Sequence, residues 1–280
     1  MIDLHSHTTE SDGTDSPEEL IRIAVQIGLE ALAITDHDTL AGYRKARPYA
    51  EAVDLPLLCG IELSTRFRGR SVHLLGYFPK GEPAAPFVAW LTELQQSRKD
   101  RNRRMAERLQ ALGIPITLEE VERKGRSMAG RPHFARVLME KGYVSSIQQA
   151  FEEYLDESAK GYVERQEADF AESVALIAAS GGVASVAHPI RLLRNAAEPL
   201  RDTIRAMRDA GLPALEAYHS DHRPADVRFY EALAREFGIG VTGGSDYHGL
   251  NKPNIRLGTG ASGNLDVQMD VLISLRRLAA

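Results

Sequence analysis

The first fourteen residues contain two histidines and an acidic turn whose spacing suits metal binding. A short, mainly apolar run at residues 2–4 leads directly into His5-Ser6-His7. Residues two apart in a strand point to the same side, so His5 and His7 can face one point. Imidazole is the commonest side-chain metal ligand. Asp12 follows in a Ser-Asp-Gly turn, which can bring its carboxylate back to that point. The segment therefore predicts a metal site at the end of an N-terminal strand.

Similar polar residues follow other apolar runs further along the chain. Runs at 31–35, 55–61, 183–187 and 239–244 read as buried strands, and a histidine or carboxylate follows each of them. Another strand is expected at 72–77, and His73 lies inside it rather than after it. The complete set of candidate metal ligands is His5, His7, Asp12, His37, Glu62, His73, His188, Asp246 and His248.

Helices are expected between these strands. Ser16, Pro17 and Glu19 form a capping box that opens a helix ending before Gly28. Alternation of strands and helices predicts a parallel sheet with right-handed crossovers. In barrels of this kind, functional groups gather at the carboxyl ends of the strands. A further strand at 212–218, followed by His219 and His222, brings the expected total to about seven.

The alternation stops between residues 83 and 164, where we expect helices and no strand. Apolar residues recur at helical spacing from 85 to 112, and Thr117-Leu118-Glu119-Glu120 forms a second capping box. We therefore expect a helical cap at 83–164, inserted into a barrel made of 1–82 and 165–280. The basic run from Arg98 to Arg104 is expected to be an exposed helix face.

Length, charge and composition limit the possible functions. The 280 residues carry a formal net charge of −5 and include one cysteine, so an internal disulfide is excluded. The negative charge argues against stable binding of duplex nucleic acid and against capture by a membrane surface. The chain contains no apolar run long enough to span a bilayer and no signal peptide. We expect a cytoplasmic protein without a membrane partner.

Several ordered motifs together resemble the PHP family, named for polymerase and histidinol phosphatase. The motifs that carry the resemblance are Asp3-Leu4-His5-Ser6-His7, Ser11-Asp12-Gly13, Ile34-Thr35-Asp36-His37-Asp38, Gly60-Ile61-Glu62, Val72-His73-Leu74-Leu75-Gly76-Tyr77, Ala187-His188-Pro189 and Gly244-Ser245-Asp246-Tyr247-His248-Gly249. The resemblance implies an α/β fold, a distorted (β/α)7 barrel that holds two to three divalent metals. It assigns His5, His7, Glu62 and Asp246 to the first metal, Glu62, His73 and His188 to the second, and Asp12, His37 and His248 to the third.

Many family members have a histidine where this chain has Asp12, which leaves the third metal open. The mixed ligand set suits Mn²⁺, Zn²⁺ or Fe²⁺ and does not choose among them. Clustered divalent ions lower the pKa of bound water and clamp attacking and leaving oxygens, so we expect phosphate ester hydrolysis by a metal-bridging hydroxide. His219 or His222 is a candidate general acid, and an ordinary surface histidine is an equal alternative for either.

The expected cap resembles that of a PHP subgroup, the nucleoside 3′,5′-bisphosphate phosphatases and short-RNA 5′-exonucleases. The residues that carry this second resemblance are Gly130-Arg131-Pro132-His133 and Gly161-Tyr162-Val163. Arginine binds phosphate in a bidentate manner, and Arg131 precedes a helix start, itself an anion-binding place. Arg131, His133 and Arg165 are thus candidate substrate-binding residues, although Arg131 and Arg165 could equally be solvated surface charges.

Three functions remain open. The leading hypothesis is a metal-dependent phosphoesterase that acts on small nucleotides, in particular nucleoside 3′,5′-bisphosphates, or on the 5′ ends of short oligonucleotides. A second is a phosphatase for another small phosphate, such as histidinol phosphate or a cyclic sugar phosphate. A third is a non-catalytic metal-binding module, which the complete ligand set disfavours.

Overall fold

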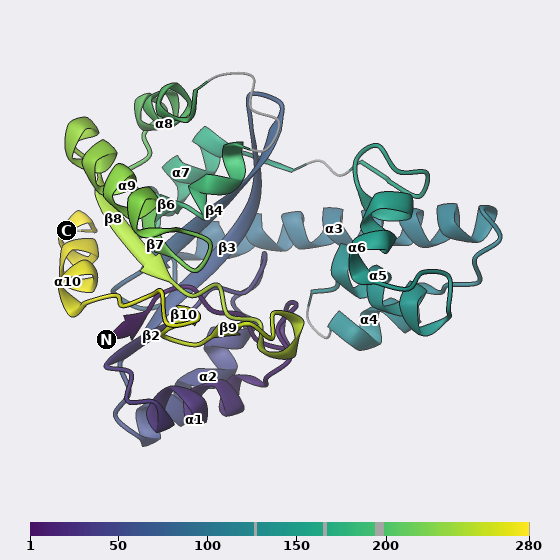
Figure 1. Cartoon of the computed structure of the whole chain (residues 1–280), viewed down its shortest axis with the longest axis horizontal. Coiled ribbons are helices and arrows are strands. Elements are labelled where there is room, and N and C mark those ends of the chain that lie inside the picture. Colours follow the sequence, from purple (N-terminus) through teal and green to yellow (C-terminus); the bar gives the residue numbers. More distant parts are fainter. Residues whose placement is uncertain (126–127, 165–166, 194–198, 280) are drawn as a thin grey trace.

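The fold is built around a curled sheet of seven strands that almost closes into a barrel. The computed structural model describes the whole chain apart from residues 126–127, 165–166, 194–198 and 280 (Figure 1). The strand order is β1 (Ile2–Asp3), β2 (Ala31–Ile34), β3 (Leu57–Phe67), β4 (Arg70–Phe78), β6 (Val183–Val186), β7 (Ala214–His219) and β8 (Gly240–Gly244). The amide of Leu4 donates to Gly243 O at 3.2 Å, and the amide of Asp246 donates to His5 O at 2.8 Å. These bonds join the two end strands, and the predicted barrel is confirmed.

The sheet is mixed, so the expectation of a parallel sheet is wrong for β4. This strand runs antiparallel to both β3 and β6. A tight turn connects β3 to β4, with Arg68 at φ 48° and Gly69 at φ 76°, and so short a connection can join only antiparallel strands. The reversal places the start of β4 at the edge where β3 ends. His73, near that start, pairs with Ser64 and so reaches the same edge as the other candidates.

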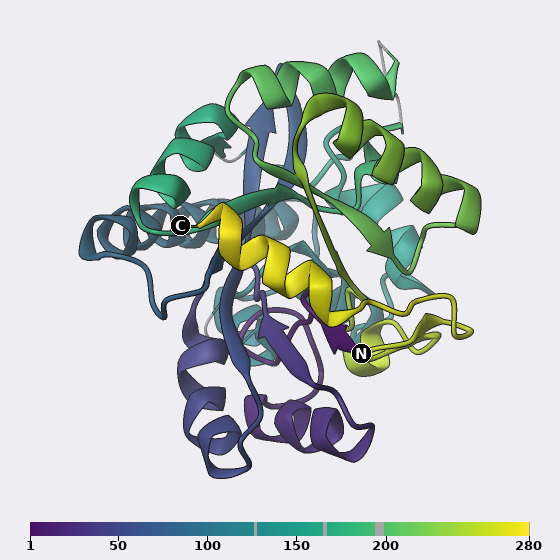
Figure 2. The same ribbon diagram turned by 90° about the vertical axis from the view of Figure 1, so that its left-hand side faces the viewer.

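Helices surround the barrel (Figure 2). They are α1 (Pro17–Gln26), α2 (Ala41–Ala52), α7 (Phe170–Ala179), α8 (Leu200–Asp209), α9 (Pro224–Phe237) and α10 (Met269–Leu278). The capping box of Ser16 and Glu19 opens α1 as predicted. The amphipathic helices α8, α9 and α10 were not among the expected elements. Val271 and Leu275 of α10 belong to the same apolar core as Ile2 and Leu4, and α10 packs against β8.

A group of helices lies between β4 and the short strand β5 (Ala168–Asp169), which pairs with β3. The group consists of α3 (Ala85–Ala111), α4 (Leu118–Gly125), α5 (Arg131–Glu140), α6 (Ile147–Ala150) and the π-helix η1 (Phe151–Leu155). Its apolar core includes Met105, Leu109 and Phe134, whereas Phe87, near the start of α3, packs into the barrel core. The expected helical cap is therefore present, joined to the barrel through α3 (Figure 1). The limits at 83 and 164 remain a prediction. Of the helices in the described ranges, none is long and apolar enough to cross a membrane.

Candidate active site

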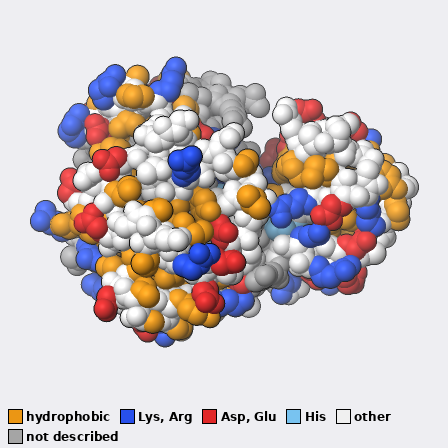
Figure 3. Space-filling view, turned by 60° about the horizontal axis from the view of Figure 1, so that its bottom comes forward, with side chains coloured by type: hydrophobic (Ala, Val, Ile, Leu, Met, Phe, Trp, Pro, Cys, Tyr) orange, Lys and Arg blue, Asp and Glu red, His pale blue; other side chains and the backbone are white. Residues whose placement is uncertain are grey.

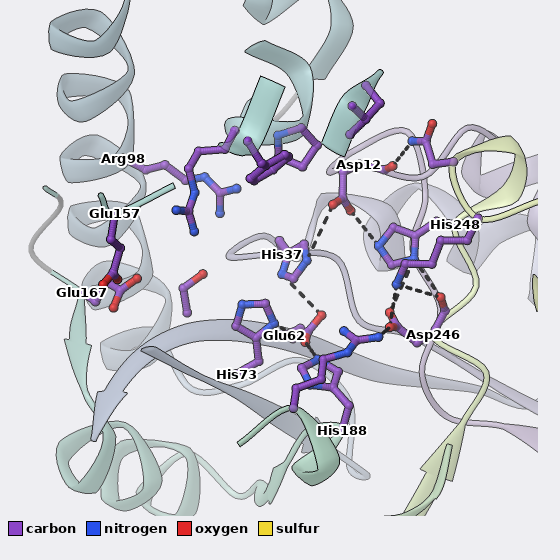
Figure 4. A pocket seen from close by; sticks show the side chains of 18 of the residues that line it. Asp12, His37, Glu62, His73, Arg98, Glu157, Glu167, His188, Asp246 and His248 are labelled. Carbon is purple, nitrogen blue, oxygen red and sulfur yellow. Dashed lines mark hydrogen bonds and ion pairs between the residues drawn. The ribbon is translucent and has the colours of Figure 1, made fainter. Parts of the chain in front are cut away.

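The strand ends bring all nine candidate metal ligands to one end of the barrel. Figure 4 shows the seven that line the cavity there, which leaves out His5 and His7. Ligand atoms within 4.8 Å of one another form several groups. One group contains His5, His7, Glu62 and Asp246. Another group contains His7, Asp12, His37 and His248. A third joins His37, Glu62 and His73. The first grouping coincides with the set expected for the first metal. The second grouping contains all three residues expected to bind the third metal, Asp12, His37 and His248.

Glu62 lies at the centre of the cluster. Its Oε1 is 2.8 Å from Nδ1 of His73 and 3.0 Å from Nε2 of His188. Its Oε2 is within 3.3 Å of ring nitrogens of His5, His7 and His37. A carboxylate offers about four lone-pair sites, fewer than the five imidazoles around it. Nitrogen and oxygen atoms that converge in this way suit cations placed between them.

The pKa shifts of His7, His188 and Glu62 favour metal binding. Burial lowers the pKa of His7 to about 3 and that of His188 well below its ordinary value. Burial alone would raise the pKa of Glu62, but the histidines around it hold that pKa well below the usual range. Neutral imidazole and ionised carboxylate are the forms that bind metals. His7 Nε2 and His37 Nδ1 are also buried without a hydrogen-bond partner in the described part of the chain. The residues therefore fit divalent ions.

Glu216, which the sequence analysis missed, holds His5 from behind. Its Oε1 lies 2.8 Å from His5 Nδ1, and its Oε2 accepts the amide of His188 at 2.6 Å. A carboxylate at Nδ1 directs the Nε2 lone pair of His5 towards Glu62 and Asp246. Burial alone would lower the pKa of His5, but Glu216, Glu62 and Asp246 raise it well above its ordinary value. The cluster thus carries surplus negative charge, which a cation would neutralise.

Two basic side chains bind one carboxylate oxygen of Asp246, Oδ2. Arg191 Nη2 donates to Asp246 Oδ2 at 2.9 Å, and Lys252 Nζ donates to the same atom at 2.6 Å. The other oxygen, Oδ1, lies 3.5 Å from Nε2 of both His5 and His7. The carboxylate is therefore fixed with one oxygen towards the histidines. Neither Arg191 nor Lys252 was expected from the sequence, because each lies outside the strand-end motifs.

A cavity of about 380 Å³ lies over this cluster, between the barrel and the cap. Candidate ligands line one side, and the cap contributes four arginines and one carboxylate, Glu157, to the other. The cap arginines are Arg98, Arg101, Arg131 and Arg136. Figure 3 shows blue Lys and Arg side chains on the cap lobe where it faces the barrel, with a pale-blue histidine in the hollow. The cavity has the size of a small-molecule site and two chemically different walls.

The cap arginines differ from the sequence-based expectation. Arg98 and Arg101, expected on an exposed face, are only 8% and 6% exposed. They point inwards because α3 crosses from barrel to cap, so this part of its surface faces the cavity. Arg103 and Arg104 lie on the exposed side. The expectation is therefore wrong for the two arginines that line the cavity.

The other predicted site residues fall in different places. Arg131 lines the cavity, with its guanidinium 5.9 Å from the ring centre of Phe151. His133 is buried, its Nδ1 accepts the amide of Gly130 at 3.0 Å, and it is not among the described lining residues. The candidate acids His219 and His222 are also buried and absent from that lining, and His219 Nε2 lies 3.4 Å from Asp246 Oδ2. A substrate contact for His133 and proton donation by His219 or His222 remain predictions. Arg165 lies outside the described residues.

Comparison with known proteins identifies the family. The model of the PHP domain matches residues 3–213. The chain belongs to the PHP domain family. The PHP protein is 33% identical to a 5′-3′ exoribonuclease of Haemophilus influenzae over 247 residues, which is 88% of this chain and 89% of the relative. It is also 33% identical to a 3′,5′-nucleoside bisphosphate phosphatase of Chromobacterium violaceum, over 88% of this chain and 87% of the relative.

Solved structures agree with this assignment. A candidate metal-dependent phosphoesterase from Bifidobacterium adolescentis superposes with a TM-score of 0.85 at 32% identity, covering 100% of this chain and 96% of the other. An amidohydrolase from Chromobacterium violaceum with bound sulfate gives 0.82 at 29% identity, covering 97% and 96%. The predictions of a PHP-family member and of a phosphoric ester hydrolase are confirmed.

Proposed function

We propose that this PHP protein uses two to three divalent ions to hydrolyse a phosphate monoester of a small nucleotide that carries a second phosphate. The observation that carries the proposal is the cavity with two walls, metal-ligand chemistry on one and arginines on the other. Hydrolysis of a substrate with a single phosphate would not require the arginines of the second wall. The relative named as a 3′,5′-nucleoside bisphosphate phosphatase supports this choice of substrate.

The barrel wall would hold the metals. His5, His7, Glu62 and Asp246 would hold the first ion, Glu62, His73 and His188 the second, and Asp12, His37 and His248 the third. Mn²⁺, Zn²⁺ and Fe²⁺ all accept this mixed set of ligands. Such ions supply a nucleophilic water at neutral pH and offset charge on the phosphoryl oxygens.

The surrounding residues would keep these ligands in place. Glu216 fixes the ring of His5, and Arg191 with Lys252 fixes the carboxylate of Asp246. Both cations line the cavity, so they also lie within reach of a phosphoryl group bound beside Asp246. Their positive charge would favour the approach of an anionic substrate.

The cap wall would bind the non-reacting phosphate. Arg131 and Arg136 both line the cavity from α5, and arginine pairs with phosphate through two parallel hydrogen bonds. Partial burial lowers the pKa of Arg136. Its guanidinium makes no hydrogen bond or ion pair with the described residues, whereas Arg131 donates to Leu155 O, so Arg136 is the better placed of the two. Each charge-assisted bond contributes about 1.5–3 kcal/mol.

The same cavity is compatible with a terminal nucleotide at the 5′ end of a short oligonucleotide. The relative from Haemophilus influenzae, named as a 5′-3′ exoribonuclease, supports this second substrate. Here the rest of the strand would leave through the open side of the cavity. Both substrates present a phosphate to the metals and a second phosphate to the cap.

A substrate panel with Mn²⁺ tests the proposal. It compares a nucleoside 3′,5′-bisphosphate, the matching monophosphates, a short 5′-phosphorylated RNA, histidinol phosphate and a small aryl phosphate. We expect kcat/KM for the bisphosphate to exceed that for the monophosphates by about tenfold or more, which corresponds to ~1.4 kcal/mol. Equal values for mono- and bisphosphate would exclude recognition of a second phosphate, and no hydrolysis of any compound would exclude the phosphoesterase itself.

A further inference from the structure

A buried ion pair connects the cap to the loop that carries His37. We propose that Arg98 of α3 and Asp38 form a positioning device that holds His37 for metal binding, so that the cap takes part in building the metal site. This inference rests on the proposed function, because it treats His37 as a metal ligand. Both partners are buried, Asp38 being 0% and Arg98 8% exposed.

Arg98 is fixed from the side of the cap. Its Nη1 donates to Asp38 Oδ2 at 2.6 Å, and its Nε donates to Ala129 O at 3.0 Å, just before α5. Gly130 leaves room for the guanidinium, because a Cβ at this position would lie 2.4 Å from Arg98 Nη2. Asn102, one turn further along α3, also donates to Ala129 O at 2.9 Å. The guanidinium therefore links α3, the start of α5 and the barrel loop.

Asp38 is fixed from the side of the barrel. Its amide donates to Glu62 O at 2.9 Å, and its Oδ1 accepts the amide of Ser64 at 3.0 Å. Its φ is 53°, in the left-handed region that residues other than glycine seldom occupy. Gln95 of α3 donates to its carbonyl oxygen at 2.9 Å. Two side chains of the cap helix thus hold a residue whose backbone conformation depends on its contacts.

The position of Asp38 determines that of the residue before it. His37 Nδ1 lies 3.3 Å from Glu62 Oε2, and His37 Nε2 lies 3.7 Å from Asp12 Oδ2. In the described part of the chain, His37 Nδ1 has no hydrogen-bond partner that would orient the ring. The ring direction therefore depends on the backbone at 37–38 and on packing against the rings of His7 and His73. Loss of the Arg98 contact would release this loop and leave the buried Asp38 carboxylate without its cationic partner.

Metal titration of the metal-free full-length protein tests the inference. Mn²⁺ is added to the wild type and to Arg98→Met, Asp38→Asn and Arg98→Lys, and each site is followed by electron paramagnetic resonance. Asparagine tolerates a left-handed φ and can still accept from Ser64, so Asp38→Asn removes the charge and the acceptor that faces Arg98 but keeps the contact with the barrel. Arg103→Met is the matched control, because Arg103 lies on the same helix and is 60% exposed in its pair with Asp100.

We expect Arg98→Met and Asp38→Asn to weaken the one site that needs His37 by about tenfold or more, as for other residues that orient metal ligands. The remaining sites and the control should be unchanged, and Arg98→Lys should restore part of the affinity. In a double-mutant cycle, Arg98→Met should add nothing to His37→Ala. A purely structural role would instead weaken all sites together or add to His37→Ala, and either result would overturn the inference. So would unchanged Mn²⁺ binding in Arg98→Met.

A second measurement is independent of metal and of activity. Amide hydrogen exchange in the metal-free protein should be about tenfold faster at residues 36–39 in Arg98→Met than in Arg103→Met. Equal exchange in the two variants overturns the positioning role even if the wild type hydrolyses every substrate. Faster exchange in a protein that binds no Mn²⁺ would keep the link between cap and loop but remove the proposed function.

Discussion

The two walls of the cavity are built in different ways. On the barrel wall, Glu62 and Asp246 are at most 2% exposed, and each of them contacts several other members of the cluster. On the cap wall, Arg131 and Arg136 are partly exposed and have few partners. The barrel carboxylates are therefore held by contacts within the protein, whereas the α5 arginines still have hydrogen-bonding capacity for a ligand. This difference suits a division of labour in which the barrel residues perform the chemistry and the α5 arginines select the substrate.

Removing the central carboxylate should produce the largest effect. Glu62→Gln keeps the shape of the side chain but removes the charge around which five histidines gather. We expect loss of at least two ions per chain and a fall in kcat/KM of roughly a thousandfold, because bound metal contributes several kcal/mol to the transition state. Elemental analysis and kinetics would measure both. Asp12→Asn, which affects only the third set, is the comparison, and full metal occupancy in Glu62→Gln would refute the assignment.

A smaller effect on metal binding is expected when Glu216, which orients the ligand His5, is changed. Glu216→Gln keeps a hydrogen-bond acceptor for the His188 amide but removes the charge beside His5 Nδ1. We expect metal affinity to fall about 10–100-fold, as for other carboxylates that orient a histidine ligand. The measurement is the Mn²⁺ dissociation constant. Added Mn²⁺ should restore activity in this variant but not in Glu62→Gln, and failure of that rescue would mean that Glu216 does more than orient His5.

Changes to the two α5 arginines of the cap wall, Arg131 and Arg136, should affect the choice of substrate alone. Arg136→Ala should reduce the preference for a bisphosphate over a monophosphate by about tenfold, corresponding to the loss of one charge-assisted contact. Arg131→Ala should reduce it less, since Arg131 already donates to Leu155 O at 3.4 Å. Metal content and hydrolysis of an aryl phosphate should stay the same. An equal loss for mono- and bisphosphates would assign Arg136 to the reacting phosphate and remove the division between the walls.

The smallest effect on catalysis is expected at His222. This histidine is buried, with Nδ1 2.8 Å from Ala217 O and its ring 4.6 Å from that of Tyr230. His222→Gln should lower the melting temperature and leave kcat of the metal-loaded enzyme unchanged. The pH–rate profile should also be unaltered. A selective fall in kcat for substrates with a poor leaving group would restore His222 as the proton donor.

Short-range patterns in the sequence identified most strands of the barrel and the candidate ligands near their ends, and the family resemblance supplied the closed barrel. A strand that ends in His5-Ser6-His7 or in Asp246-Tyr247-His248 positions its polar residues through local geometry, because alternate side chains share a face and parallel strands end at one edge. The capping boxes at Ser16 and Thr117 are local for the same reason, since each is closed within four residues. Glu216 also had a local signal, a lone carboxylate inside an apolar strand, which needs a buried partner.

Tertiary structure decided the features that depend on distant partners. The direction of β4, and with it the placement of His73, followed from pairing with both β3 and β6. The basic run on α3 could not be divided into buried and exposed arginines from its sequence, because burial of Arg98 depends on Asp38, sixty positions away. The chain alone thus specifies which groups can bind metal and phosphate. Only the packing of the cap on the barrel determines which arginines face the cavity, because helical periodicity defines a face but not what covers it.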